Sequence, residues 1–377
     1  MNTQRVPSLR DALAEVPDFR QAQGRRYELL PVLLLCCVAV MCGARSQSAI
    51  AEWGTNYGTA WLHRLGIRRR RAPSQPTLHR ILKGLDCAAL ERALTRWAET
   101  ILSATAGRLE AFAIDGKTLR GSARQGAPES HLISALSHRL GIVMAQLGVT
   151  DKSHELGHVE PLLDALVLCG RVVTCDALHT HADVARRIVA GGGDYLLPVK
   201  DNQPLLRQDI ALVFAPATTL ADTITSAQTI DAHGGRIETR RLRASTALLG
   251  YIDFPAHQQV MELRRTITEK RTGKTREELV YGITSLAPQR ASAAELLKLW
   301  REHWHIENKL HYVRDVTFDE DRSQVRTTHI PQVMATLRNV AIAVLRWGGA
   351  ENIAAACRRY AAQPALALAA VGISRRE

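Results

Sequence analysis

The spacing of hydrophobic and polar positions divides the chain into a helical first part and a strand-rich middle. Up to about residue 100, apolar residues recur three and four positions apart, which predicts short helices over 11–16, 31–43 and 46–53. A further short helix, capped by Ser74 or Thr77, is expected to run to about residue 85. From residue 108 the pattern changes to short apolar runs that are typical of strands.

The middle of the chain alternates between such runs and two amphipathic segments. The order is strand, strand, strand, helix, strand, helix, strand, which predicts a mixed sheet with helices on its faces. The expected strands are 109–114, 131–137, 141–149, 171–175 and 195–199, and the expected helices are 159–168 and 180–190.

Residues 205 to 290 interrupt this alternation with β-rich pieces at 236–242, 260–268 and 279–283. Two helical runs, 331–347 and 353–371, close the chain. The predicted organisation is therefore an N-terminal helical domain, an α/β core in two segments, a β-rich insertion and a helical tail. Their predicted bounds are 1–105 for the first domain, 106–204 and 291–350 for the core, 205–290 for the insertion and 351–377 for the tail.

The segment from Ala293 to Arg314 lacks Pro and Gly and is expected to be one long helix. Its apolar positions form a stripe that includes Trp300 and Trp304, both expected in the core, and Glu307 falls on that stripe. A carboxylate that points into a protein interior is costly unless it is paired, hydrogen-bonded or bound to a metal. For Glu307 alone, a salt bridge to an arginine is the more common explanation.

The chain is strongly basic, with Lys+Arg 49 against Asp+Glu 37 and a formal net charge of +12. This excess favours a polyanionic partner, either nucleic acid or an anionic membrane surface, although many basic proteins only have solvated lysines and arginines. The run Arg68, Arg69, Arg70 and Arg71 directly precedes a predicted short helix. It fits a DNA-binding element and a basic surface loop equally well.

Cysteine usage and hydropathy indicate a cytoplasmic protein with no membrane partner. The seven cysteines include no CxxC pair, so neither a disulfide framework nor a zinc ribbon is indicated. The apolar run from Leu29 to Ala44 is shorter than the roughly 20 residues that a membrane span needs. We expect a buried helix there.

Two buried strands are each followed by an aspartate, Asp115 after Ile114 and Asp176 after Cys175. Taken singly, such an aspartate is more often a turn residue that hydrogen-bonds its own backbone. Together with Glu307, however, three carboxylates can converge at one side of a sheet. Hard oxygen ligands suit Mg²⁺ or Mn²⁺ better than Zn²⁺, and two such ions can hold the attacking and leaving oxygens of a phosphodiester displacement.

Five blocks of sequence, spread over nearly the whole chain, carry a family resemblance. They are AIDGKTLRGS from Ala113, VVTCDALHTHADVARRI from Val172, GGDYLLPVKDNQPLL from Gly192, HGGRIETRR from His233 and REHWHIENKLHYVRDVTFDEDRSQVR from Arg301. Their combination resembles DDE-type insertion-sequence transposases, of the group that includes the H-repeat-associated proteins.

This resemblance implies an RNase H-like core in which Asp115, Asp176 and Glu307 are the catalytic acids and hold two Mg²⁺ or Mn²⁺ ions. It also implies cleavage of double-stranded DNA at transposon ends and transfer of the freed 3′-OH into target DNA, by a homodimer or larger assembly on DNA. Two alternatives are an RNase H-like nuclease without strand transfer and a non-catalytic DNA-binding protein of the same fold.

The chain departs from the family pattern around its last acid. Related transposases often place Tyr, Arg and Lys where this chain has Trp300, His303 and Arg314. The resemblance therefore implies that Arg301 or Arg314 contacts DNA phosphate. Lys117 and Lys200, each just past a predicted strand end, are further candidates for phosphate contacts, or are ordinary solvated lysines.

Overall fold

The computed structural model describes residues 8–104, 109–123, 129–149, 155–216 and 220–373. The chain divides into two units, each formed by several segments. The first unit contains residues 1–107, 116–158 and 305–377, and the second unit contains residues 108–115 and 159–304.

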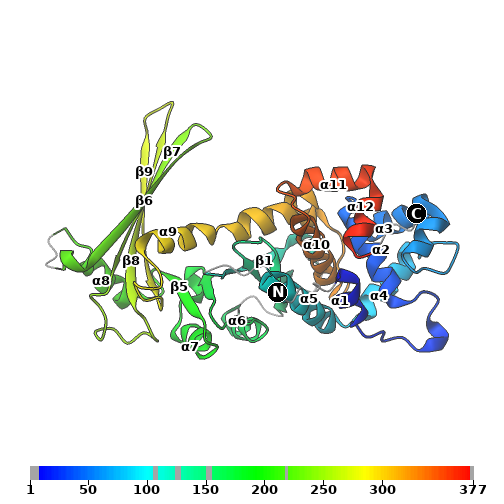
Figure 1. Cartoon of the computed structure of the whole chain (residues 1–377), viewed down its shortest axis with the longest axis horizontal. Helices are drawn as coiled ribbons and strands as arrows, with labels where there is room; N and C mark the ends of the chain where they lie inside the picture. The colour runs from blue at the N-terminus through cyan, green and yellow to red at the C-terminus, as the bar shows by residue number, and fades with distance from the viewer. Residues whose placement is uncertain (1–7, 105–108, 124–128, 150–154, 217–219, 374–377) are drawn as a thin grey trace. The chain divides into compact units, whose positions relative to one another are not determined.

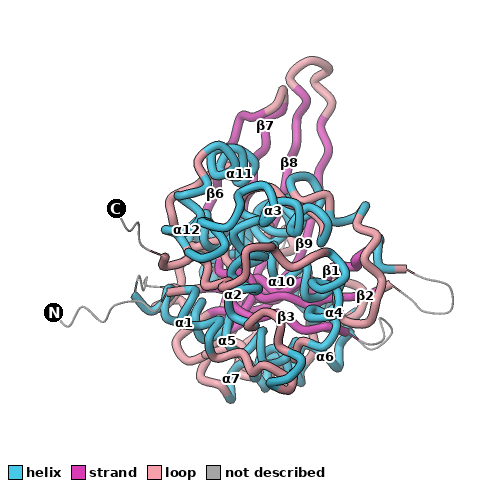
Figure 2. The backbone as a smooth tube through the Cα atoms, turned by 90° about the vertical axis from the view of Figure 1, so that its right-hand side faces the viewer, coloured by secondary structure: helices cyan, strands magenta, loops and turns pink. Residues whose placement is uncertain are grey.

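Helices build most of the first unit, and α2 lies at its centre. Twelve of the thirteen residues of α2 are buried, because this helix is apolar on all sides and packs against α1, α3, α10, α11 and α12 (Figure 2). Among the described residues, no helix is long and apolar enough to cross a membrane. The helices of this unit are α1 Leu9–Ala14, α2 Leu29–Met41, α3 Gln47–Arg64, α4 Gln75–Gly84, α5 Cys87–Ala104, α10 Ile330–Trp347, α11 Ile353–Ala362 and α12 Pro364–Ala370.

The strands form a nine-stranded sheet in the order β3-β2-β1-β4-β5-β9-β8-β7-β6. β1, β4 and β5 are parallel neighbours, whereas the β2–β3 pair and every pair from β5 to β6 are antiparallel. This arrangement confirms the predicted mixed sheet. The strands are β1 Ala111–Leu119, β2 Ser130–Ser137, β3 Val143–Val149, β4 Val172–Cys175, β5 Asp194–Val199, β6 Ile224–His233, β7 Arg236–Ser245, β8 Gln259–Glu269 and β9 Thr275–Thr284.

In the second unit, α9 covers one face of the sheet. Its buried leucines, including Leu296 and Leu297, pack with residues of β4, β5, β7 and β8 in one hydrophobic cluster. Figure 1 shows β6 to β9 continuing as long strands past α9. The other helices outside the first group are α6 Glu155–Asp164, α7 Ala182–Ala190, α8 Pro204–Val213 and α9 Ala293–Glu302.

Several predicted elements have different bounds in the structure. β1 continues past Asp115 to Leu119, and β6 was not predicted because its alternation carries few large apolar residues. The last predicted helix is two helices, because Pro364 begins α12 and cannot continue the hydrogen bonding of α11.

The expected helix 293–314 is the largest difference between prediction and structure. α9 ends at Glu302, and two π-helical segments follow, Ile306–His311 and Val313–Thr317. The wider π winding changes which side chains face inward. Trp300 is partly buried against the α9 cluster as expected, but the prediction of a core position for Trp304 is wrong, since 58% of it is exposed.

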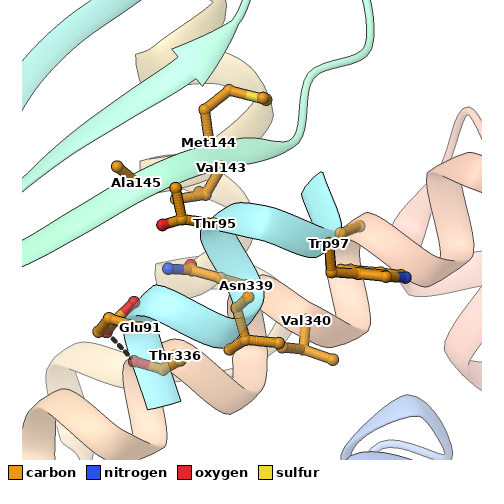
Figure 3. A pocket seen from close by; sticks show the side chains of 11 residues that line it. Glu91, Thr95, Trp97, Val143, Met144, Ala145, Thr336, Asn339 and Val340 are labelled. Carbon is orange, nitrogen blue, oxygen red and sulfur yellow. Dashed lines mark hydrogen bonds between the residues drawn. The ribbon is translucent and has the colours of Figure 1, made fainter. Parts of the chain in front are cut away.

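A buried polar network joins α5, β3 and α10 inside the first unit. Thr336 donates a hydrogen bond of 2.5 Å to the carboxylate of Glu91 (Figure 3). The side-chain amide of Gln146 donates another hydrogen bond to this carboxylate, of 3.0 Å. Asn339 in turn donates to the Gln146 carbonyl oxygen at 2.8 Å. Burial, only partly offset by these donors, raises the pKa of Glu91 to about 7.

Candidate functional site

In the second unit, Asp115 and Asp176 occupy equivalent places on neighbouring parallel strands. The paired register ends at Ile114 and Cys175, and each aspartate is the next residue along its strand. Because the two strands run in the same direction, both aspartates come directly after the paired residues at the same end of the pairing. Both are partly buried, and their carboxylates are near enough to the Cys175 thiol to raise its pKa, although burial is the larger cause.

Asp176 also begins a short 3₁₀ turn. Its carboxylate accepts a hydrogen bond of 3.3 Å from the backbone N–H of His179, and 46% of its side chain remains exposed. The capping contact satisfies one oxygen of the carboxylate and leaves the side chain accessible. Asp176 can therefore cap this turn and still have an oxygen available to bind a metal ion.

His303, which directly follows α9, contacts the same strand. Its Nδ1 lies 2.9 Å from the hydroxyl of Thr174, two residues before Asp176. Within the second unit this hydrogen bond fixes the end of α9 against β4. In the sequence, His303 stands out only as a departure from the family pattern, and this contact was not predicted.

Glu307 lies in the first π-helical segment of the first unit, four residues before His311. Nδ1 of His311 donates to a Glu307 carboxylate oxygen at 3.1 Å. This hydrogen bond, with a further contribution from the positive charge of Lys117, lowers the pKa of Glu307 against the opposing effect of burial. Glu307 is therefore an ionised carboxylate at neutral pH, and half of its side chain is exposed.

Lys117 lies on β1 and makes ion pairs with two carboxylates from the region that follows Glu307. Its ammonium is 2.7 Å from Asp315 and 3.8 Å from Asp321, and only 10% of its side chain is exposed. A phosphate contact, as predicted from the sequence, would require Lys117 to leave these partners. Lys200, in contrast, is exposed directly after β5.

The two arginines considered for phosphate contacts have different surroundings. Arg301 is exposed for 46% of its side chain and pairs with Asp231 at 2.9 Å. Arg314 is completely buried, and its guanidinium donates to Glu320 at 2.7 Å and to Gln146 at 3.3 Å. In this conformation Arg314 supports the interior of the first unit.

The four consecutive arginines lie in the connection between α3 and α4. Arg68, Arg69, Arg70 and Arg71 are all exposed. The loop is held from its backbone, because Tyr27 donates to the carbonyl oxygen of Arg71 and Thr59 donates to that of Arg70. Of the exposed side chains, that of Arg69 donates to the carbonyl oxygen of Arg26 at 2.9 Å and that of Arg68 lies 3.8 Å from Glu28. Both a DNA-binding element and a basic surface loop are compatible with this arrangement.

Comparison with known proteins identifies the chain. Residues 106–344 match the family model described as Transposase DDE domain, and residues 10–98 match the model described as DDE_Tnp_1-associated. The chain belongs to the DDE transposase family.

Relatives of this transposase match it over most of their own length. It is 30% identical over 348 residues to the Escherichia coli O157:H7 protein named "Putative transposase YncI", covering 90% of this chain and 88% of that protein. It is 29% identical over 352 residues to the Escherichia coli K12 protein named "H repeat-associated putative transposase YhhI", covering 90% of each. The resemblance to the H-repeat-associated group is thus confirmed.

Among solved structures, a piggyBac transposase synaptic complex with hairpin DNA matches with a TM-score of 0.43 and 10% identity. The match covers 97% of this chain and 77% of that one.

The donor set of this transposase fits a hard divalent cation. The three acids offer carboxylate oxygens, which Mg²⁺ and Mn²⁺ prefer. The thiol of Cys175, which directly precedes Asp176, is buried and its pKa is raised, so it stays protonated and is a poor ligand. Zinc coordination by thiolate at this place is therefore disfavoured.

Proposed function

We propose that the chain is a metal-dependent DNA transposase that cuts DNA at transposon ends and joins the freed 3′-OH to target DNA. The observation that carries the proposal is the parallel register that sets Asp115 and Asp176 one residue past Ile114 and Cys175, in a member of the DDE family. Two carboxylates so arranged at the end of a strand pair are suited to binding a shared cation.

The proposal brings Asp115, Asp176 and Glu307 to one site. The positions of Lys117 and Asp115 along β1 support this. They are two residues apart on one strand and therefore share a face, and Lys117 is close enough to Glu307 to lower its pKa.

The contact of His303 supports the inclusion of Asp176. His303 holds the end of α9 against Thr174, close to Asp176 along β4. Glu307 follows only four residues later in the chain. The four-residue connection from His303 limits how far Glu307 can be from β4, which supports the proposed grouping of the two acids.

Each group then has a defined task. When bound, divalent ions at such a site polarise the phosphoryl group and neutralise the charge that develops on it. The three carboxylates would hold the ions, and His311 and Lys117 would keep Glu307 ionised. Exposed cations, chiefly Arg68 to Arg71 with Arg301 and Lys200, would bind the DNA backbone, whereas the buried Arg314 would stabilise the fold.

The test uses purified protein and linear DNA that carries the two ends flanking its gene. Incubation with Mg²⁺ should produce strand cleavage at the ends and, with a supercoiled target added, joined products. A nuclease without strand transfer would give cleavage alone, and a non-catalytic DNA-binding protein would give a gel shift without either product. Cleavage that persists in EDTA would contradict the metal-dependent proposal.

A further inference from the structure

Glu307 and His311, hydrogen-bonded within the first π-helical segment, differ strongly in solvent exposure. The Glu307 side chain is 52% exposed, whereas that of His311 is only 5% exposed. The 3.1 Å hydrogen bond between them therefore runs from a buried donor to a carboxylate at the surface. An ionised carboxylate can only accept hydrogen bonds, so the imidazole must donate from Nδ1.

The donor is more rigid than the acceptor. His311 lies beside Leu310 in the sequence and, like Ile306 and Leu310 of the same segment, is buried. A half-exposed glutamate that moves freely loses side-chain entropy when a ligand holds it in one geometry. A hydrogen bond from a side chain that packing already holds reduces the number of orientations open to the Glu307 carboxylate before any ligand arrives.

Lys117 cannot replace this interaction. It affects Glu307 through its charge, while its own short ion pair is with Asp315. A charge favours ionisation of the carboxylate without fixing its direction. The directional contact to Glu307 found among the described residues comes from His311.

We propose that His311 is a positioning residue that holds the Glu307 carboxylate in the orientation needed to bind a divalent metal ion. This rests on the proposed function, in which Glu307 is a metal ligand. Hydrogen-bonding partners of ligating side chains commonly contribute 10–100-fold to metal affinity, and we expect an effect of that size here.

The test measures Mn²⁺ binding to the full chain without DNA, by electron paramagnetic resonance of the free ion. His311→Phe fills the site but has no donor, and should weaken binding by about 10–100-fold. His311→Asn keeps an N–H near the position of Nδ1 and should bind within a few-fold of the parent. Tyr312→Ala, at the exposed neighbouring position, is the matched control and should change nothing.

A double-substitution cycle separates positioning from packing. In the Glu307→Gln background, His311→Phe should cause little additional loss, because the carboxylate that it positions is already gone. Near-ultraviolet circular dichroism establishes that each variant is folded. If the Phe variant does not fold, His311→Leu, which also lacks a donor, takes its place in the cycle.

The outcomes distinguish this inference from the proposed function. If Glu307→Gln weakens Mn²⁺ binding and folded His311→Phe does not, the positioning role is wrong and the metal site stands. If His311→Asn binds as poorly as His311→Phe, the donor role is also wrong. If neither the parent nor Glu307→Gln binds Mn²⁺, the proposed metal site itself fails.

Discussion

Arg314 donates a hydrogen bond of 2.7 Å to Glu320, and the side chains of both residues are almost completely buried. Arg338 holds the other carboxylate oxygen at the same distance. Burial alone would raise the pKa of Glu320, but the two guanidinium groups outweigh it and lower that pKa. Glu320 is thus a carboxylate that stays ionised inside the protein, between Arg314 and Arg338.

We predict that Arg314→Ala destabilises the protein by about 3–5 kcal/mol, because it leaves part of a buried ionic network without its partner. Chemical unfolding at neutral pH measures this change. Arg301→Ala, which removes an exposed ion pair, is the control and should cost less than about 1 kcal/mol. An Arg314→Ala protein of parental stability with weakened DNA binding would instead favour the phosphate contact inferred from the sequence.

The buried carboxylate of Glu91 should make stability depend on pH. Its pKa rises from 4.5 to about 7 on folding, so the folded state retains a proton that the unfolded state has lost. The contribution of Glu91 to stability should therefore decline as pH rises from about 4.5 to about 7, by roughly 3 kcal/mol in all.

The measurement is the difference in unfolding free energy between the parent and Glu91→Gln across that range. Subtraction removes the titration of other groups. The unfolding free energy of the parent, relative to that of Glu91→Gln, should fall as pH increases and become constant above pH 7. A difference that does not vary between pH 5 and 7 would show that Glu91 has an ordinary pKa.

The arginine run should supply part of the affinity for DNA. Each neutralised phosphate adds roughly 0.9 to the slope of log K against log salt, so replacing Arg68 to Arg71 by Ala should lower the slope by about 2–4 units. Specific and unrelated duplexes should be affected alike. Replacement of Arg358 and Arg359, exposed on α11, provides a control of similar chemistry. An unchanged slope in the folded quadruple variant would move the DNA contact elsewhere.

The sequence predicts the elements whose local pattern is strong. The β2–β3 hairpin, β4 and β5 are short segments rich in apolar residues, and the structure contains each of them within a few residues of the expected bounds. The aspartates after Ile114 and Cys175 were identified for the same reason, because each follows such a segment.

The surroundings of Glu307 could not be predicted in the same way. The residues from Ala293 to Arg314 have an ordinary helical pattern, and nothing in it distinguishes α winding from the π winding that follows α9. The burial of Arg314 depends on Glu320 and Arg338, and that of Lys117 on Asp315, 198 residues away. Such pairings are decided by tertiary structure and leave no periodic signal.

The most direct test of the central claim is single-turnover cleavage of transposon-end DNA in Mg²⁺ by the parent, Asp115→Asn, Asp176→Asn and Glu307→Gln. Each substitution removes one charged ligand and keeps the side-chain size. We expect every variant to bind the ends with near-parental affinity and to lose cleavage by at least about 100-fold, since each carboxylate supports the same metal site. A folded variant that cuts at the parental rate would exclude its residue from the site and contradict the account.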